Sequence, residues 1–413
     1  MTHRPFLNSI RPVNLLSFGP DTPEIELRPL NVLIGPNGSG KSNFIEIIRL
    51  LHFLPDKEPW NFVLETGGVS EWIWKGGRDR NSEATLRVEF SLGDITNGHL
   101  VSKPRLMDFA IALDRFESSF RVGTESVGTI EEDGGRNKLY SWIERRGSQG
   151  ELRLRSERPS PAPIRFDLNL DRSVLSQLTS LPLQAAGVGQ EMPELFEVAE
   201  FFEKFDFHQD WEFGADLSAR DPVPVGQSVE RLEEDGRNLA QMLTYYRDYH
   251  GPTFERISEM MKQFYGSFQG LDVRLIGTHL QPAIREEGGF SVSAYRMSDG
   301  ALRWLALLAI LLNPMPAPVI CIDEPELGLH PDAIHTLADL LVEASKRTQM
   351  IVTTHSDALL DAFTDTPEVV CVCEKVEGST RIKRLDNDHL KAWLEKYSLG
   401  KLWMSGEIGG NRW

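Results

Sequence analysis

The chain has 413 residues, of which 40% are hydrophobic and 25% are charged. These proportions lie near the average of soluble globular proteins and exclude a disordered or fibrous class, while the length predicts one large composite domain or two lobes. The 44 Lys and Arg residues against 61 Asp and Glu residues give a formal net charge of −17. Most of the surface therefore repels polyanions, and any contact with nucleic acid must be local.

The N-terminal segment has no uninterrupted apolar stretch followed by a small-residue cleavage site. We therefore expect no signal peptide and a cytoplasmic protein. Two strand-like segments follow, IRPVNLLSF at 10–18 and EIELRPLNVLIG at 24–35. A helix is predicted from about Lys41 to Phe53, and the turn at Pro55 ends it.

The loop between the second strand and this helix matches the pattern G-x-x-x-x-G-K-[ST]. Its glycines let successive backbone N–H groups converge on phosphate oxygens, and the helix directs its positive end at the same place. Lys41 would reach the β- and γ-phosphates of ATP, and Ser42 would bind Mg²⁺. The alternative is a turn that holds no anion. The predicted nucleotide-binding residues are Gly35, Pro36, Asn37, Gly38, Ser39, Gly40, Lys41, Ser42 and Asn43.

The middle of the chain has a different pattern. The segments TLRVEFSLG at 85–93 and LMDFAIALDRF at 106–116 alternate apolar and polar residues, which predicts an antiparallel β-rich region. Residues 136–165 hold eight Arg or Lys and three Asp or Glu, whereas residues 190–235 hold fourteen acidic and three basic residues. Each window is either a solvated face or a binding surface. We find no heptad run long enough for a coiled coil.

From about residue 291, apolar strands alternate with helices, which predicts a mainly parallel sheet covered on both faces. The apolar helix at 301–312 contains Arg303 and spans only about 18 Å, too short to cross a membrane, so we expect it to be buried. The fold class is α/β, a P-loop NTPase core with an antiparallel β-rich region and an inserted helical lobe. We expect three segments: residues 1–135 and 286–413 build the core, and 136–285 form the inserted lobe.

Three cysteines, Cys321, Cys371 and Cys373, all lie beside apolar residues and make no disulfide framework. A reducing compartment is therefore expected. Cys371 and Cys373 alternate within VVCVCE, so both lie on one face of a predicted strand. Core packing is expected there rather than a metal site.

A P-loop alone does not complete the coordination of the metal and does not orient the attacking water. A second strand that ends in a carboxylate is therefore required. The segment PVICIDEPE supplies it, because a buried strand delivers Asp323 at its C-terminal end and Glu324 follows directly. Two adjacent carboxylates repel each other unless a cation lies beside them. Asp323 is the predicted Mg²⁺ ligand and Glu324 the predicted general base. A turn with solvated acids is the alternative.

Another apolar strand, QMIVTTH at 349–355, ends at His355. A lone histidine is usually structural, but ligands collect at this edge of such sheets, and an imidazole can bind a γ-phosphate. His355 is therefore predicted to be catalytic together with Lys41 and Glu324. Ser356 is interpreted as the N-cap of the next helix.

Ser298, Asp299 and Gly300 stand at the start of the apolar helix, and we call them the signature residues. A serine there is the expected N-cap, which needs no function. The functional alternative is a second phosphate site made of the Ser298 Oγ, the Gly300 N–H and the helix dipole.

Together, GPNGSGKSN, MSDGALR, ICIDEPELGLHPD and IVTTHSD resemble ABC-type ATPases of the RecF and SMC kind, above all the stand-alone bacterial AAA_21-type ATPases. The resemblance is strong over about residues 26–54 and 291–363. It implies a compact RecF-like second lobe without long coiled-coil arms. It also implies that ATP is bound between two head-to-head subunits, with the signature residues of one subunit capping the γ-phosphate on the other.

The sequence departs from transporter-type signatures at Asp299 and Ala301, in agreement with the RecF-like branch. His330 stands where the loop after the carboxylates often has aspartate, which puts contacts across the dimer there in doubt. The glutamine of the family's Q-loop stays open among four candidates, Gln177, Gln184, Gln190 and Gln209.

Two functions remain open. The first is an ATP-switched dimer that clamps DNA in repair, recombination or anti-phage defence, with the basic window 136–165 as its contact. The second is an ATP-driven scaffold or sensor that regulates an effector protein without touching DNA. In the second case the acidic window and FDFHQDWEF at 205–213 would be partner surface, although burial is the expectation for Phe205, Phe207 and Trp211.

Overall fold

The computed structural model shows a chain of two compact units. The first comprises residues 1–205, 371–384 and 409–413, and the second comprises residues 206–370 and 385–408. Within the described part of the chain, no helix is long and apolar enough to cross a membrane. The structure describes residues 6–76, 83–93, 95–96, 99–100, 104–117, 119–133, 136–153, 163–180, 193–209, 218–226 and 229–409.

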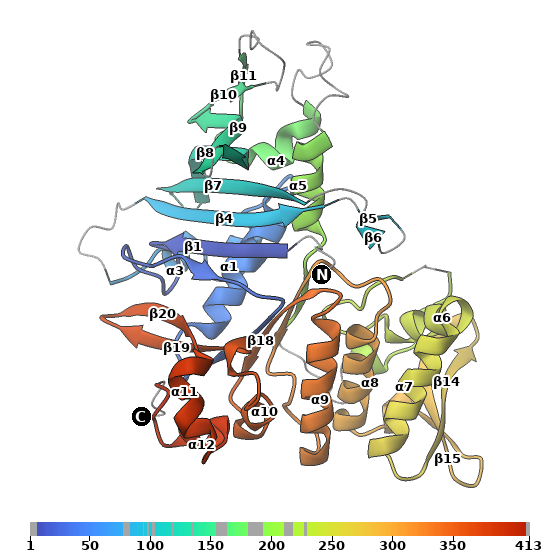
Figure 1. Ribbon diagram of the computed structural model, residues 1–413. Helices are drawn as coiled ribbons and strands as arrows, with labels where there is room; N and C mark the ends of the chain where they lie inside the picture. Colours follow the sequence, from blue (N-terminus) through green and yellow to red (C-terminus); the bar gives the residue numbers. More distant parts are fainter. Residues whose placement is uncertain are drawn as a thin grey trace. The chain divides into compact units, whose positions relative to one another are not determined.

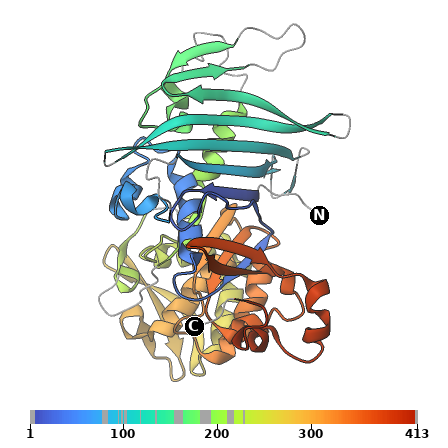
Figure 2. The same cartoon turned by 90° about the vertical axis from the view of Figure 1, so that its left-hand side faces the viewer.

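The first unit contains an eight-stranded antiparallel sheet in the order β11-β10-β9-β8-β7-β4-β1-β2. Figure 2 shows its long strands running side by side. The sheet strands are β1 (Phe6–Val13), β2 (Ile25–Glu26), β4 (Ala84–Leu92), β7 (Arg105–Phe116), β8 (Ser119–Asp133), β9 (Arg136–Arg146), β10 (Gln149–Leu152) and β11 (Ile164–Asp167). Strand β3 (Leu30–Ile34) lies beside β19 (Val370–Val376), which pairs with β20 (Ser379–Arg384), and β5 (Ile95–Thr96) pairs with β6 (His99–Leu100). The helices are α1 (Lys41–Phe53), α2 (Asn61–Glu65), α3 (Val69–Trp72), α4 (Val174–Gln177), a 3₁₀ turn (Leu178–Ser180) and α5 (Pro193–Glu203).

Aromatic side chains form the core between this sheet and α5. Alternate residues of β4 are buried, as expected for a strand with one face on a core. Phe90 of β4 stacks on Phe201 at 5.4 Å between ring centroids, and Phe109 of β7 meets Phe202 edge to face at 5.5 Å. The apolar face of α5 is thus covered by the sheet.

The second unit combines a parallel sheet with an antiparallel one (Figure 1). Strands β12 (Asp206–His208), β17 (Val319–Asp323) and β18 (Gln349–Thr354) are parallel neighbours. Strands β13 (Val223–Pro224), β15 (His279–Glu286) and β14 (Phe268–Ile276) form the antiparallel sheet, and β16 (Ser291–Ser293) pairs with β15. The helices are α6 (Leu239–Tyr249), α7 (Gly251–Phe264), α8 (Asp299–Leu311), α9 (Pro331–Ala344), α10 (Asp357–Asp361), α11 (Asn387–Leu394) and α12 (Leu399–Met404). The 3₁₀ turns are Ser218–Arg220, Ala294–Arg296 and Pro367–Val369.

Most elements expected from the sequence are observed. The helix predicted from about Lys41 to Phe53 has those bounds, and α8 is buried over most of its length. The α/β class with an additional antiparallel β-rich region is confirmed, and the longest helices among the described residues have 14 residues, far short of coiled-coil arms. Cys371 and Cys373 are buried, and burial raises the pKa of the Cys371 thiol to about 11.

The expected inserted segment 136–285 is divided between the two units. Strands β9 to β11 continue the antiparallel sheet of the first unit, because β9 pairs with β8 along its length. Helices α6 and α7 and the hairpin β14–β15 belong to the second unit.

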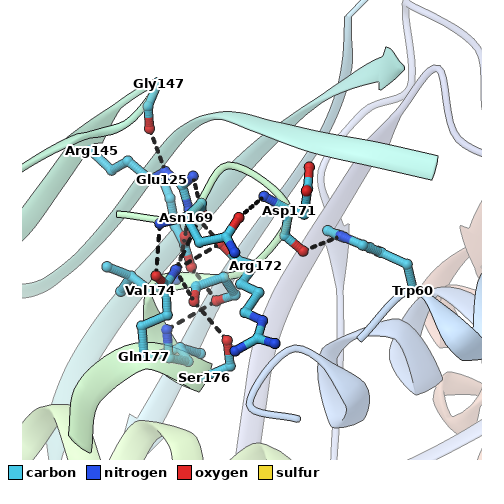
Figure 3. Close-up of polar contacts among 12 residues, drawn as sticks. Trp60, Glu125, Arg145, Gly147, Asn169, Asp171, Arg172, Val174, Ser176 and Gln177 are labelled. Atoms are coloured by element: carbon cyan, nitrogen blue, oxygen red, sulfur yellow. Dashed lines mark hydrogen bonds and ion pairs between the residues drawn. The ribbon is translucent and has the colours of Figure 1, made fainter. Parts of the chain in front are cut away.

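A buried ion pair fastens the loop before α4 to the sheet of the first unit (Figure 3). The side chains of Glu125 and Arg145 are both fully buried, with 3.7 Å between carboxylate and guanidinium. Glu125 accepts hydrogen bonds from the Ser173 hydroxyl and, at 2.7 Å, from the Val174 N–H. Arg145 donates to the main-chain carbonyls of Gly147, Asn169 and Arg172.

Candidate functional site

The P-loop of the first unit follows a fully buried strand and opens a helix. Strand β3 ends at Ile34, and α1 begins at Lys41 with Gly40 as its N-cap residue. No side chain caps this helix, so its first amide groups are left for another acceptor. Such an uncapped N-terminus is a ready site for a phosphate group.

Residues near the end of the chain brace this loop. The Thr380 hydroxyl of β20 donates to the Ser39 carbonyl at 2.8 Å and lies 2.7 Å from the Ser17 hydroxyl. Gly40 has a φ of +100°, and a Cβ there would lie 2.1 Å from the Thr380 Oγ1. Only glycine therefore fits between helix and strand. The brace presets the loop before any ligand arrives.

Lys41 is 6% exposed and points into the loop. Its ammonium donates to the carbonyls of Gly35 at 2.9 Å and Pro36 at 3.3 Å. The buried Ser39 hydroxyl has no hydrogen-bond partner among the described residues, whereas Ser42 is exposed. A buried cation, a free buried hydroxyl and uncapped amides match the oxygen atoms of a polyphosphate.

The predicted carboxylates and histidine come together in the second unit. Strand β17 ends at Asp323, whose carboxylate accepts a hydrogen bond from the Thr353 hydroxyl of the neighbouring strand β18. Glu324 follows, and its Oε1 lies 3.3 Å from the Nε2 of His355. Parallel pairing of β17 and β18 explains this meeting, because both strands end at the same edge.

We call residues 323–328 the carboxylate turn. Glu324 has a φ of +44°, a left-handed conformation that non-glycine residues adopt only when their surroundings hold them. The Glu324 N–H donates to the Thr353 carbonyl at 3.1 Å, and the Glu324 carbonyl accepts from the Arg303 guanidinium at 2.9 Å. The strained backbone directly follows the strand, and the side chain of Glu324 lies beside His355.

Glu326 is a further member of this cluster that the sequence analysis did not single out. It is 8% exposed and accepts hydrogen bonds from the Thr354 hydroxyl and, at 3.3 Å, from the His355 N–H. Burial raises the pKa of its carboxyl group. The third acid of the segment DEPE at 323–326 was the available signal. Glu326 therefore links the carboxylate turn to Thr354, the last residue of β18, and to His355, which follows it.

The signature residues open helix α8. The Ser298 hydroxyl accepts from the Ala301 N–H at 3.2 Å, so the N-cap interpretation is confirmed. Its proton remains able to donate to a further acceptor. Arg220, itself 3% exposed, binds the Asp299 carboxylate and the carbonyls of Ala294 and, at 2.8 Å, Met297. Arg220 thus fixes both the signature residue Asp299 and the main chain that precedes helix α8.

A cavity of about 450 Å³ borders the signature residues. Two helix N-termini meet there, those of α8 and of α9, whose N-cap His330 accepts from the Asp332 N–H through Nδ1. Apolar side chains, among them Met261, Phe264 and Trp304, also line the cavity. The lining residues from α7, α8 and the start of α9 include Met261, Phe264, Tyr265, Ser298, Gly300, Trp304 and His330.

The structure separates the four glutamine candidates. Gln177 donates its amide to the carbonyls of Asn169, Arg172 and Ser173, which is a structural role. Gln184 and Gln190 lie outside the described residues, as does Trp211. Gln209 follows β12, which runs parallel to β17 with His208 opposite Ile322. Gln209 therefore stands at the sheet edge that also presents Asp323.

A P-loop that opens a helix, and carboxylates that end a buried strand, are features of the P-loop ATPase class. Comparison with known proteins gives the family. The chain belongs to the AAA_21 family, described as "AAA domain, putative AbiEii toxin, Type IV TA system", whose model matches residues 30–361. The resemblance inferred from the motifs is confirmed, and membership of a P-loop ATPase family implies nucleotide binding.

A curated relative, the Retron Ec83 probable ATPase of Escherichia coli, is 29% identical over 146 residues. The match spans 32% of this chain and 26% of the relative. The fold is similar to that of an SMC head solved in complex with the C-winged helix domain of ScpA, with a TM-score of 0.52 and 16% identity. That likeness covers 93% of this chain and 99% of the SMC head, and it concerns the fold.

Proposed function

We propose that the protein is a Mg²⁺-dependent ATPase in which the P-loop binds the phosphates of ATP and the carboxylate turn supplies a metal ligand and the general base. The observation that supports this most is the placement of Glu324, 3.3 Å from His355 and directly after Asp323. A general base needs an oriented carboxylate beside the metal ligand, and the left-handed backbone at Glu324 provides that orientation.

Each proposed role follows from the contacts of the residue. Lys41 and the backbone N–H groups of residues 35 and 37–43 would bind the phosphates, and Ser42 and Asp323 are the proposed Mg²⁺ ligands. Among the described residues no group of three His, Cys, Asp or Glu could hold a metal. Mg²⁺ is commonly held by one or two protein oxygens together with substrate phosphates. When bound, the ion would neutralise charge on those phosphates.

Glu324 would accept the proton of the attacking water, and His355 would fix the carboxylate and contact the γ-phosphate. Gln209 is the proposed glutamine of the Q-loop, since it stands at the end of the strand beside β17. From that position its amide can bind Mg²⁺ or the attacking water.

We propose that ATP also joins two subunits. Ser298 and Asp299 are exposed and Gly300 is half-buried at a helix N-terminus, where Ser298 and the Gly300 N–H would cap a phosphate on the partner. The cavity beside them leaves that end of α8 open. Because such a nucleotide binds the dimer alone, it shifts association by mass action.

Substitution of Glu324 by Gln tests both parts. Gln keeps the size of the side chain but cannot accept a proton, so ATP should bind while turnover falls by about 10²- to 10⁴-fold. The variant should then elute as a dimer with Mg²⁺ and ATP, measured by size-exclusion chromatography with light scattering. Adding Ser298→Arg to this variant should return it to the oligomeric state that the protein has without nucleotide. Normal hydrolysis by Glu324→Gln would refute the catalytic assignment, and a dimer that survives Ser298→Arg would refute the trans signature.

We further propose that this ATPase regulates an effector protein in genome defence. The similarity to the Retron Ec83 probable ATPase is the observation that favours this proposal. Clamping of DNA has less support than the sequence suggested, because three arginines of the basic window pair with carboxylates. Arg145 is buried against Glu125, Arg153 lies 3.4 Å from Glu144, and Arg165 lies 3.0 Å from Glu151.

Two measurements separate these roles. Titration of DNA against the protein with ATP at rising salt would give a steep log–log slope if phosphates were neutralised. We expect no ATP-dependent binding even at low salt. Purification of the tagged protein from its native host should instead retain a stoichiometric protein partner, and recovery of the ATPase alone would count against the effector role.

A further inference from the structure

The first turns of helix α8 contact the carboxylate turn at two points. Gly300 packs directly on the carbonyl of Gly328, so closely that a Cβ on Gly300 would lie 2.6 Å from that oxygen. One turn further along, the Arg303 guanidinium donates to the Glu324 carbonyl at 2.9 Å. The helix that begins at the signature residues is therefore attached to the backbone of the proposed general base.

Arg303 is the unusual residue of this helix. It is 9% exposed within an otherwise apolar, buried segment. Placing a charge there is costly unless its partners compensate, and packing alone would favour leucine. Its hydrogen-bond partner is the Glu324 carbonyl. Burial lowers the pKa of Arg303, and the charges of Glu326 and Glu324 act in the opposite direction. The carboxylate turn thus offsets part of the cost of burying the charge.

The signature end of the helix is held equally firmly. Arg220 binds Asp299 and the carbonyls just before it, and the Ser298 hydroxyl caps the first turn. Arg303 stands five positions after Ser298, so both lie within two helical turns. A displacement of the signature residues therefore carries Arg303 with it rather than being absorbed by a loose loop.

We propose that Arg303 is a positioning residue that transmits phosphate binding at the signature to Glu324 of the same chain. The inference rests on the proposed ATPase function and adds its regulation. A phosphate on the partner subunit pulls on Ser298 and Gly300, α8 moves as one body, and Arg303 shifts the Glu324 main chain. Each subunit then hydrolyses its own ATP efficiently only after its signature has met the ATP of its partner.

Substitution of Arg303 by Gln tests the positioning role. Gln is too short to reach the Glu324 carbonyl in the same way, so kcat should fall by about 10- to 100-fold because Glu324 is misplaced. KM and the affinity for ATP should stay near the wild-type values. Arg303→Lys should recover part of kcat, because a cation with a long side chain is restored.

Arg347→Gln is the matched control at the other end of the same helix. Arg347 donates to the carbonyls of Asn313 and, at 2.6 Å, Leu311, so its loss perturbs α8 without touching the carboxylate turn. We expect Arg347→Gln to keep the wild-type kcat after its melting temperature has been checked. Equal losses of kcat in the two variants, or a wild-type kcat in Arg303→Gln, would overturn the positioning role.

Mixed dimers test the transmission itself. A Ser298→Arg chain keeps its P-loop and carboxylates, and a Lys41→Ala chain keeps its signature, so mixing them should restore a reduced but measurable rate at one site. The working Glu324 then belongs to the Ser298→Arg chain, whose own signature has no phosphate to bind. Adding Arg303→Gln to that chain should change the rate less than about twofold, because no signal remains to transmit.

The outcomes separate the two levels of the proposal. If mixing restores activity and Arg303→Gln then costs as much as in the homodimer, transmission is refuted while the ATPase and its dimer stand. If mixing restores nothing although the wild type hydrolyses ATP, the proposed trans arrangement fails and the transmission fails with it. If the wild type itself shows no hydrolysis, the proposed function is wrong.

Discussion

Replacement of the buried Glu125 by Gln should change how the stability of the protein depends on pH. Burial raises the pKa of Glu125 to about 7, although hydrogen bonds from Ser173 and Val174 and the charge of Arg145 act in the opposite direction. In the folded protein Glu125 therefore keeps its proton up to a pH of about 7, whereas the unfolded chain, with a pKa near 4.5, releases that proton at a lower pH.

The sign follows from linkage. Stability contributed by a carboxyl group with a raised folded pKa is fully present below about pH 4.5 and is lost as the pH rises through about 7. One pKa unit corresponds to about 1.4 kcal/mol, so this group should remove about 3 kcal/mol between these limits. Gln resembles the protonated carboxyl and has no such term. The amide group of Gln can also donate a hydrogen bond to the Ser173 hydroxyl oxygen, while its carbonyl oxygen accepts one from the Val174 N–H.

The assay is urea unfolding of wild type and Glu125→Gln at several pH values between 5 and about 8, followed by circular dichroism. The difference between the two proteins cancels all other titrating groups. We expect the stability of Glu125→Gln relative to wild type to rise with pH by up to about 3 kcal/mol. If attraction to Arg145 outweighed burial, the variant would instead become less stable at high pH by about 3–5 kcal/mol, as for a broken buried pair. That opposite sign would refute the reasoning.

Two further substitutions test the P-loop. Lys41→Ala should abolish binding of a fluorescent ATP analogue, because it removes the buried ammonium, while far-ultraviolet circular dichroism stays unchanged; retained ATP binding by a folded Lys41→Ala protein would remove the assignment. Gly40→Ala should lower the melting temperature well beyond Gly38→Ala. Both glycines have positive φ, but only a Cβ at Gly40 collides with Thr380 and Ser17, and nothing lies within 4 Å of one at Gly38. Equal melting temperatures would show that the brace on the loop is unimportant.

The contiguous motifs were readable from the sequence because their chemistry depends on local backbone. Gly35 to Ser42 specify the turn between strand and helix by glycine content and spacing, and α1 has the expected bounds. The strand that ends at Asp323 was evident from its apolar run and terminal acids. A serine before an apolar helix likewise identified the N-cap at Ser298.

Other parts of the site depended on residues far apart in the chain. Thr380 braces Ser39 across 341 positions, and Glu326 meets Thr354 only because β17 and β18 pair in one register. No local pattern encodes strand register, so Gln209 could be distinguished from Gln177 only once β12 was placed beside β17. The sequence by itself determined the P-loop and the acids. The tertiary structure alone decided what holds them, because long-range pairing of strands sets which side chains share an edge.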